Sequence, residues 1–267
     1  MKVGLVQLCS GITVSDNIAE TSRLIRAAAA EGAALIATPE MTHLVQKDKK
    51  DLLSKISSQD KEPAVRAFAD LAKELKVNLL IGSMALKNGD KIANRSFHFT
   101  PDGVIKASYD KIHLFDAQVS DTESYRESST YTAGDGPIMT AVGQTKIGLS
   151  ICYDLRFPAL YRHYAQNGAE IVTIPAAFTV PTGRAHWDIL LRARAIETGS
   201  FVLAAAQGGT HADGRTTWGH SKVIDPWGDI IAELDHDRSG YVVAEIDLSE
   251  VEKARKRIPA WADTRPF

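Results

Sequence analysis

A weak internal repeat in the sequence limits the folds that are open to the chain. Three stretches recur in the same order, as KVGL (2–5) and KIGL (146–149), EGAALIATP (31–39) and NGAEIVTIP (167–175), and SFHFTPDG (96–103) and SKVIDPWG (221–228). Self-similarity in a fixed order indicates a repeated structural unit. Chance similarity is the alternative explanation, because each match is short.

Each half alternates strand-like and helix-like segments. The first two repeated stretches are apolar runs typical of buried strands, and the second ends at a proline in both copies. A helix is expected after each, the second near 63–76 or 187–198, and a further strand at 77–84 or 201–207. The third stretch predicts a hairpin with a tight Pro-x-Gly turn. Two such βαβαβ halves predict an α/β fold, a four-layer α-β-β-α sandwich with a pseudo-two-fold axis.

Size and charge restrict the class of protein further. With 267 residues, 44% of them apolar, the chain can bury a large core, and we expect a single domain over residues 1–267. The formal net charge of -2 provides no overall attraction to phosphate backbones or anionic lipid. No stretch is apolar enough to span a bilayer. We therefore expect neither nucleic acid nor membrane as a partner.

Three reactive side chains each follow a strand-like run. Glu40 follows residues 34–39, Lys111 follows 103–109, and Cys152 follows 146–151. Glu40 and Lys111 belong to the first half of the repeat, whereas Cys152 belongs to the second. A carboxylate, an amine and a thiol at strand ends predict a hydrolytic site where the two halves meet.

The chemistry of these groups is complementary. A free cysteine is only a few per cent thiolate at neutral pH, so it needs a base or a cation nearby. Glu40 would be that base if burial behind Pro39 raises its pKa. Lys111 and the backbone N–H of Tyr153 would stabilise the charge that develops on the attacked group. The intermediate would be a thioester, and no metal or organic cofactor is required. Taken singly, each side chain has a structural alternative, as a packed thiol or a solvated charge.

The sequence around these residues resembles the catalytic motifs of the nitrilase superfamily of carbon-nitrogen hydrolases. The motifs are PE at 39–40, YDKIHLFD at 109–116 and SICYDLRFP at 150–158, and they occur in the family's order. The resemblance spans nearly the whole chain and implies a Glu40-Lys111-Cys152 triad. It also implies a role for Glu127, because RES at 126–128 matches a family element whose glutamate positions the lysine or the substrate.

Further segments resemble one branch of that superfamily, which contains deaminated glutathione amidase and omega-amidase. They are FTVPTGRAHW at 178–187 and LLRARAIE at 190–197, while AAAQ at 204–207 and WGHS at 218–221 favour the first activity. The first enzyme class cleaves deaminated glutathione into 2-oxoglutarate and cysteinylglycine. The second acts on 2-oxoglutaramate or another small omega-amide. A nitrilase and a non-catalytic scaffold are the more distant alternatives.

The implied substrate is a small carboxylated amide, and the branch pattern suggests which residues bind it. An arginine can hold a carboxylate through two parallel hydrogen bonds, and Arg156 is the candidate. A structural ion pair at a helix start is the alternative for Arg156. Phe178 and Thr182 match positions that line the pocket in this branch.

The remaining expectations concern location and assembly. Met1 opens directly on a strand without a leader, and a working thiol needs a reducing compartment, so we expect a cytoplasmic protein. A disulfide between Cys9 and Cys152 is the alternative, whereas we interpret Cys9 as a core thiol within a strand. The resemblance implies a homodimer formed through the helix at 156–165. We expect the tail from Ile258 to Phe267 to pack on the partner subunit.

Overall fold

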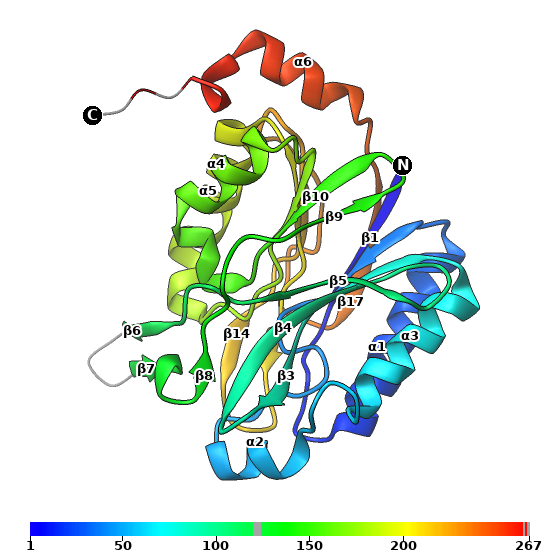
Figure 1. The fold of residues 1–267 in the computed structure, drawn as a ribbon, viewed down its shortest axis with the longest axis vertical. Coiled ribbons are helices and arrows are strands. Elements are labelled where there is room, and N and C mark those ends of the chain that lie inside the picture. The colour runs from blue at the N-terminus through cyan, green and yellow to red at the C-terminus, as the bar shows by residue number, and fades with distance from the viewer. Residues whose placement is uncertain (120–123, 264, 266–267) are drawn as a thin grey trace.

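Two sheets face each other at the centre of the computed structural model, which describes residues 1–119, 124–263 and 265 (Figure 1). The first sheet runs in the order β17 (Gly240–Glu245), β1 (Lys2–Gln7), β2 (Leu35–Ala37), β3 (Asn78–Asn88), β4 (Lys91–Phe99) and β5 (Ile105–Asp110). The second runs in the order β16 (Ile230–Glu233), β15 (Lys222–Ile224), β12 (Phe201–Ala204), β11 (Ile171–Thr173), β10 (Thr145–Leu149) and β9 (Met139–Val142).

Helices cover the outer faces of both sheets. Figure 1 shows α1 (Val14–Ala30) and α3 (Pro63–Leu75) outside the first sheet, and α4 (Pro158–Gln166) and α5 (Val180–Thr198) outside the second. Two further helices, α2 (Lys49–Lys55) and α6 (Ser249–Arg257), lie at opposite ends of the molecule. The sequence of layers is helix, sheet, sheet, helix. This arrangement confirms the predicted α-β-β-α sandwich.

The two sheets have matching topologies. In the first, β1, β2 and β3 are parallel, and β4 and β5 return antiparallel beside β3. In the second, β10, β11 and β12 are parallel, and β15 and β16 return in the same way. An antiparallel strand flanks each set, β17 beside β1 and β9 beside β10. The two halves therefore fold alike, as the sequence repeat predicts.

Repeated glycines account for part of this likeness. A Cβ atom at Gly4 would lie 3.2 Å from Ala28 of α1, and one at Gly148 would lie 2.6 Å from the Tyr164 ring of α4. Both glycines thus allow a helix to pack close to the first strand of its half. Gly32 and Gly168 end α1 and α4 with φ values of 89° and 86°. Such left-handed residues terminate helices at little cost only when they lack a Cβ.

Three apolar cores fill the spaces between the layers. Side chains along β1 point alternately to the two faces of the sheet, so this strand contributes to two of the cores. Val3 and Leu5 face the second sheet, whereas Val6 and Leu8 face α1 and α3. The third core lies between the second sheet and the helices α4 and α5. Full burial of one such side chain contributes about 1.5–3 kcal/mol, so the cores fix the relative position of the sheets.

Two local predictions were wrong. The helix expected near residue 187 begins at Val180, because Pro181 lies in its first turn, where a missing backbone N–H costs nothing. Cys9 lies beyond the end of β1, is half-buried, and donates a hydrogen bond to the Thr210 carbonyl 3.4 Å away. Both cysteines are free thiols.

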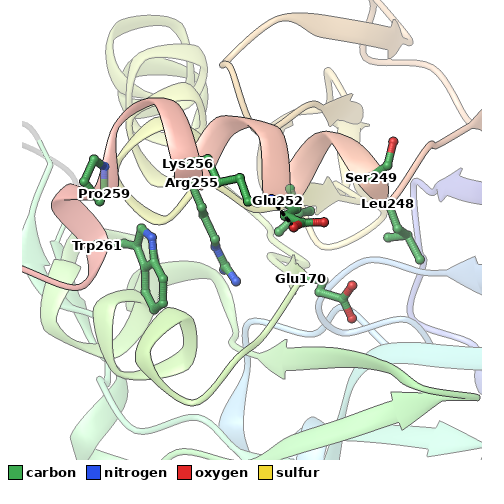
Figure 2. A pocket seen from close by; sticks show the side chains of 9 residues that line it. Glu170, Leu248, Ser249, Glu252, Arg255, Lys256, Pro259 and Trp261 are labelled. Carbon is green, nitrogen blue, oxygen red and sulfur yellow. Dashed lines mark ion pairs between the residues drawn. The ribbon is translucent and has the colours of Figure 1, made fainter.

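The C-terminal segment packs on its own subunit as far as it is described. Trp261 lies in a short 3-10 helix, η3 (Pro259–Trp261), and its ring is 4.9 Å from the Arg255 guanidinium. Figure 2 shows these two side chains lining a groove of about 560 Å³ beneath α6. Residues 264, 266 and 267 of the tail lie outside the described residues. No helix in the described ranges is long and apolar enough to cross a membrane.

Candidate active site

The loop after β10 presents the thiol of Cys152 in an unusual backbone conformation. Cys152 has a φ of 50° and begins the 3-10 helix η2 (Cys152–Arg156). Its N–H donates to the Pro175 carbonyl at 2.8 Å, which ties this loop to the end of β11. A side chain in the left-handed region is strained, and such residues gather at functional sites where surrounding contacts hold them in place.

The carboxylate of Glu40 lies at the centre of a buried polar cluster. Its Oε1 accepts hydrogen bonds from Lys111 Nζ and Asn94 Nδ2, both at 2.9 Å. Its Oε2 accepts one from the backbone N–H of Ala177 at 3.0 Å. The thiol of Cys152 and this carboxylate are close enough for each to shift the pKa of the other. Glu40, which is only 5% exposed, therefore binds the ammonium and lies near the sulfur.

Two carboxylates hold the ammonium of Lys111. Nζ lies 2.9 Å from Glu40 Oε1 and 2.9 Å from Glu127 Oε2, and the lysine is 2% exposed. An ammonium has three N–H donors. The third contact of Nζ, to Glu127 Oε1, is longer at 3.3 Å, so this is the donor that a further acceptor would take over.

Glu127 is fixed from two sides. It begins the 3-10 helix η1 (Glu127–Ser129), and its Oε2 accepts the backbone N–H of Phe115 at 2.6 Å. Its Oε1 accepts from Asn94 Nδ2 at 3.3 Å. Asn94, on β4, thus joins the two carboxylates that flank Lys111. Without these contacts Glu127 would be an ordinary loop residue.

The pKa values follow from burial and from these contacts. Burial, and then the charge of Glu40, raises the pKa of Cys152 well above its ordinary value. Burial alone would raise the pKa of Glu40, but the charge of Lys111 and the interactions with Cys152 and Asn94 outweigh it, so the pKa is lowered. The expectation that burial raises the pKa of Glu40 was therefore wrong. At rest the site holds a carboxylate and a protonated thiol.

The ammonium remains charged for a related reason. Burial lowers the pKa of Lys111, but the carboxylates of Glu127 and Glu40 have the larger combined effect, and the pKa lies well above its ordinary value. A charged lysine can therefore persist at a site closed to water. Such a fixed cation stabilises negative charge that appears on a bound reactant.

A second buried carboxylate joins the loops that carry Lys111 and Cys152. Asp154 Oδ2 accepts the Tyr109 hydroxyl at 2.7 Å and the Ile151 N–H at 2.8 Å. Its Oδ1 contacts Nδ1 of His113 at 2.7 Å and accepts that residue's N–H at 3.0 Å. Asp154 is fully buried, so it fixes one loop against the other.

The backbone N–H of Tyr153 lies in the first turn of η2. The first hydrogen bond within this helix runs from the Asp154 N–H to the Ile151 carbonyl at 3.1 Å. The N–H groups before it have no acceptor inside the helix. Since the N–H of Cys152 binds Pro175, the N–H of Tyr153 is the next donor beside the sulfur.

The candidate substrate-binding residues lie on one flank of the cluster. The Arg156 guanidinium carbon is 5.4 Å from the Phe178 ring centre and 6.0 Å from that of Tyr153. Both terminal nitrogens of Arg156 lie 3.3 Å from His186 Nδ1, and Arg156 forms no ion pair within the described ranges. The structural ion pair considered for this residue is therefore not seen.

The two other candidate substrate-binding residues, Phe178 and Thr182, are less available to a ligand than Arg156. Phe178 is 6% exposed and its ring packs 4.9 Å from that of Trp187. Thr182 lies in the first turn of α5, where its Oγ1 is 2.8 Å from Thr179 Oγ1. The Thr182 hydroxyl thus already has a partner within the protein.

Sequence reasoning missed three groups that contact the cluster. Asn94, the N–H of Ala177 and Asp154 all hold one of the reactive residues or its loop. The sequence did contain one indication of Asn94, since asparagine is depleted in strands and this one interrupts a strand-like stretch. In the structure Asn94 is fully buried within β4. Across the described ranges, no group of three or more metal-binding side chains is assembled.

Comparison with known proteins shows which family the chain belongs to. Residues 2–256 match the model of the family described as carbon-nitrogen hydrolase. The chain is 37% identical to the deaminated glutathione amidase of Yersinia enterocolitica, over 98% of this chain and 92% of that protein. It is 33% identical to the human omega-amidase NIT2, over 99% of this chain and 95% of that protein.

A solved structure agrees with this likeness. The crystal structure of the Caenorhabditis elegans NitFhit protein matches with a TM-score of 0.90 and 33% identity. The match covers 99% of this chain and 65% of the NitFhit chain, which is therefore considerably longer.

Proposed function

Since this chain belongs to the carbon-nitrogen hydrolase family, we propose that it is a thiol-dependent amidase in which Glu40, Lys111 and Cys152 carry the reaction. The observation that carries this proposal is the buried Glu40 carboxylate, which accepts a hydrogen bond from the Lys111 ammonium and lies near enough to the Cys152 thiol to raise its pKa. We take residues 1–267 as one catalytic domain.

In the first half-reaction the sulfur of Cys152 attacks the amide carbon while its proton passes to Glu40. The ammonium of Lys111 and the backbone N–H of Tyr153 stabilise the negative charge on the former carbonyl oxygen. Glu40 then donates its proton to the amide nitrogen, the C–N bond breaks, and the amine leaves. The acyl group remains on Cys152 as a thioester.

In the second half-reaction Glu40 accepts a proton from water, and the resulting nucleophile attacks the thioester carbon. The tetrahedral species is stabilised by the same two donors. When it collapses, the sulfur leaves with the proton from Glu40, and the carboxylic acid product is released. Glu127 acts as a positioning residue, because its carboxylate holds the ammonium of Lys111.

For the substrate we propose deaminated glutathione, hydrolysed to 2-oxoglutarate and cysteinylglycine. The support is the 37% identity to a protein of that name and the position of Arg156, whose guanidinium is not bound to a carboxylate of the described chain. Arg156 would hold the carboxylate of the oxo-acid part through paired hydrogen bonds. Phe178 would shape the acyl slot, and Thr182 would contribute its hydroxyl.

The alternative substrate is 2-oxoglutaramate or another small omega-amide, which is favoured by the 33% identity to omega-amidase NIT2. A side-by-side comparison of kcat/KM for the two compounds, with Cys152→Ala as the blank, distinguishes them. A ratio of about one hundred in favour of deaminated glutathione corresponds to roughly 2.7 kcal/mol and supports the first proposal. A ratio of similar size in the other direction refutes it.

A non-catalytic scaffold protein is the alternative from another functional class. The intact cluster around Cys152 argues against it, since Asn94, Ala177 and Glu127 all hold the reactive groups in place. Nitrile hydrolysis is chemically related but receives no support from the relatives named above. Turnover of neither amide by pure protein would favour the scaffold.

We also propose a cytoplasmic homodimer. Two apolar side chains project from α5 two turns apart, Ile189 at 70% and Ile196 at 55% exposure. Trp227, at 48% exposure, follows β15 near the same helix, since its neighbour Gly228 adjoins Ile196. Exposed apolar groups that gather in this way mark an interaction surface. Light scattering that reports a monomer at micromolar concentration would contradict the dimer.

A further inference from the structure

A β-hairpin is fastened to the segments that carry the candidate active site. It consists of β13 (Gly208–Thr210) and β14 (Thr216–Trp218). The Trp218 N–H donates to the Phe178 carbonyl at 3.0 Å, and Thr217 forms a bridge with Thr179. At the start of the hairpin, Gln207 Nε2 donates to the Glu40 carbonyl at 3.0 Å. The hairpin therefore has a fixed position relative to Glu40.

The turn of this hairpin carries Arg215 in a defined orientation. Its Nε donates to Asp213 Oδ2 at 2.9 Å and its backbone N–H to Asp213 Oδ1 at 3.0 Å. The Asp213 side chain is 3% exposed, whereas that of Arg215 is 30% exposed. Within the described ranges, the two terminal nitrogens of Arg215 make no hydrogen bond. A guanidinium held through Nε presents these nitrogens as a fork that matches a carboxylate.

Tyr131 connects this arginine with the catalytic cluster. It lies in β8 (Tyr131–Thr132), paired with Ile92 of β4, two residues from Asn94, whose amide binds Glu40 and Glu127. Figure 1 shows β14 and β8 at the same end of the molecule. Burial and the charge of Glu127 raise the pKa of the Tyr131 phenol, and the charge of Arg215 lowers it. The phenol of Tyr131 therefore lies within electrostatic range of both Glu127 and Arg215.

The two candidate substrates differ on the side of the leaving group. Deaminated glutathione releases cysteinylglycine, whose glycine ends in a carboxylate, whereas 2-oxoglutaramate releases ammonia. An extended dipeptide reaches about 7 Å from the scissile nitrogen. Arg156, beside Phe178 and Tyr153, is the cation proposed for the acyl side. A second carboxylate on the leaving group can be bound by a second cation on another flank of the site.

We infer that Arg215 binds the terminal carboxylate of the leaving dipeptide, oriented for this by Asp213. The inference rests on the proposed amidase function and adds a leaving-group subsite to it. Arg215 thereby selects amides of carboxylated amines over simple omega-amides. Asp213 restrains the side chain through one edge and leaves the other edge for the substrate, so little side-chain freedom is lost on binding.

The test compares three substrates in wild-type protein and in Arg215→Gln. The substrates are deaminated glutathione, the same compound with its glycine carboxylate capped as an amide, and 2-oxoglutaramate. Arg184→Gln is the matched control, because Arg184 is exposed and stacks on the Trp218 ring of the same hairpin at 5.8 Å. Arg215→Lys keeps a positive charge but removes the fork, and circular dichroism shows whether each variant is folded.

We expect Arg215→Gln to lower the kcat/KM ratio of deaminated glutathione to 2-oxoglutaramate about 10- to 100-fold, mainly through KM. Capping the carboxylate should cost the wild-type protein a similar factor and cost Arg215→Gln almost nothing. The capped substrate keeps the test valid even if the variant does not fold. A ratio unchanged in Arg215→Gln, or no effect of capping on the wild-type protein, overturns the subsite alone. Wild-type protein that hydrolyses only 2-oxoglutaramate overturns both the subsite and the proposed substrate.

Discussion

Glu127→Gln isolates the charge that holds Lys111 in place. The variant keeps the shape of the side chain but removes a carboxylate 2.9 Å from Lys111 Nζ, an attraction of about 6 kcal/mol at an effective dielectric constant of 20. Its new amide NH2 group must also face the Phe115 N–H or the Asn94 amide, and donor then meets donor. Because Glu40 still anchors the ammonium, we expect about 3–4 kcal/mol to appear as lost transition-state stabilisation.

This corresponds to a fall in kcat of about 10²- to 10³-fold with little change in KM. Single-turnover kinetics with deaminated glutathione and with 2-oxoglutaramate would measure it. Glu197→Gln is the control, because Glu197 also pairs with a buried arginine, Arg194 at 2.6 Å, but outside the site. A folded Glu127→Gln with wild-type kcat on both substrates would refute the view that this carboxylate positions the lysine.

Two further predictions concern pH and one concerns packing. The pKa of Glu40 is lowered and that of Cys152 raised, so kcat/KM should stay level between about pH 5 and pH 8, and an apparent pKa near neutrality in the pH profile would contradict the assigned protonation states. Burial lowers the pKa of His98 from its ordinary value of 6.5 to about 4. Between these two pH values the imidazole is protonated in the unfolded chain but neutral in the folded protein. The contribution of His98 to stability should therefore fall by up to about 3 kcal/mol as pH falls from 6.5 to 4, and urea titrations should show a smaller fall in His98→Asn. Gly148→Ala would place a Cβ 2.6 Å from an aromatic ring of α4 and should cost about 1–3 kcal/mol in thermal unfolding, whereas Gly136→Ala, with no atom within 4 Å, should cost little.

The architecture could be predicted from the sequence because the same packing contacts occur in both halves and require the same residues. Gly4 and Gly148 recur because a helix passes close to the first strand in each half. Lys2 and Lys146 recur because each Nζ caps the end of the following helix, at the carbonyls of residues 31 and 167. Contacts of this kind are visible in the sequence as repeated residues. The start of α5 could not be predicted, because a proline at position 181 is compatible both with a loop and with a first helical turn.

The reactive residues could be placed together from the sequence, but their electrostatics could not. Strand ends and motif order indicate that Glu40, Lys111 and Cys152 meet. The sign of the pKa shift at Glu40 depends on whether Lys111, Cys152 and Asn94 together outweigh burial, and Asn94 comes from another segment of the chain and carries no local motif. Long-range hydrogen bonds decide such shifts, and one sequence does not record which distant groups provide them.

The most direct test of the account is identification of the acylated residue by rapid quenching and mass spectrometry. Wild-type protein mixed with excess amide should show a hydroxylamine-sensitive adduct on the peptide that contains Cys152. The adduct should be absent in Cys152→Ala and should form far more slowly in Glu40→Gln. Undiminished hydrolysis by Cys152→Ala, or an adduct on another side chain, would contradict the account.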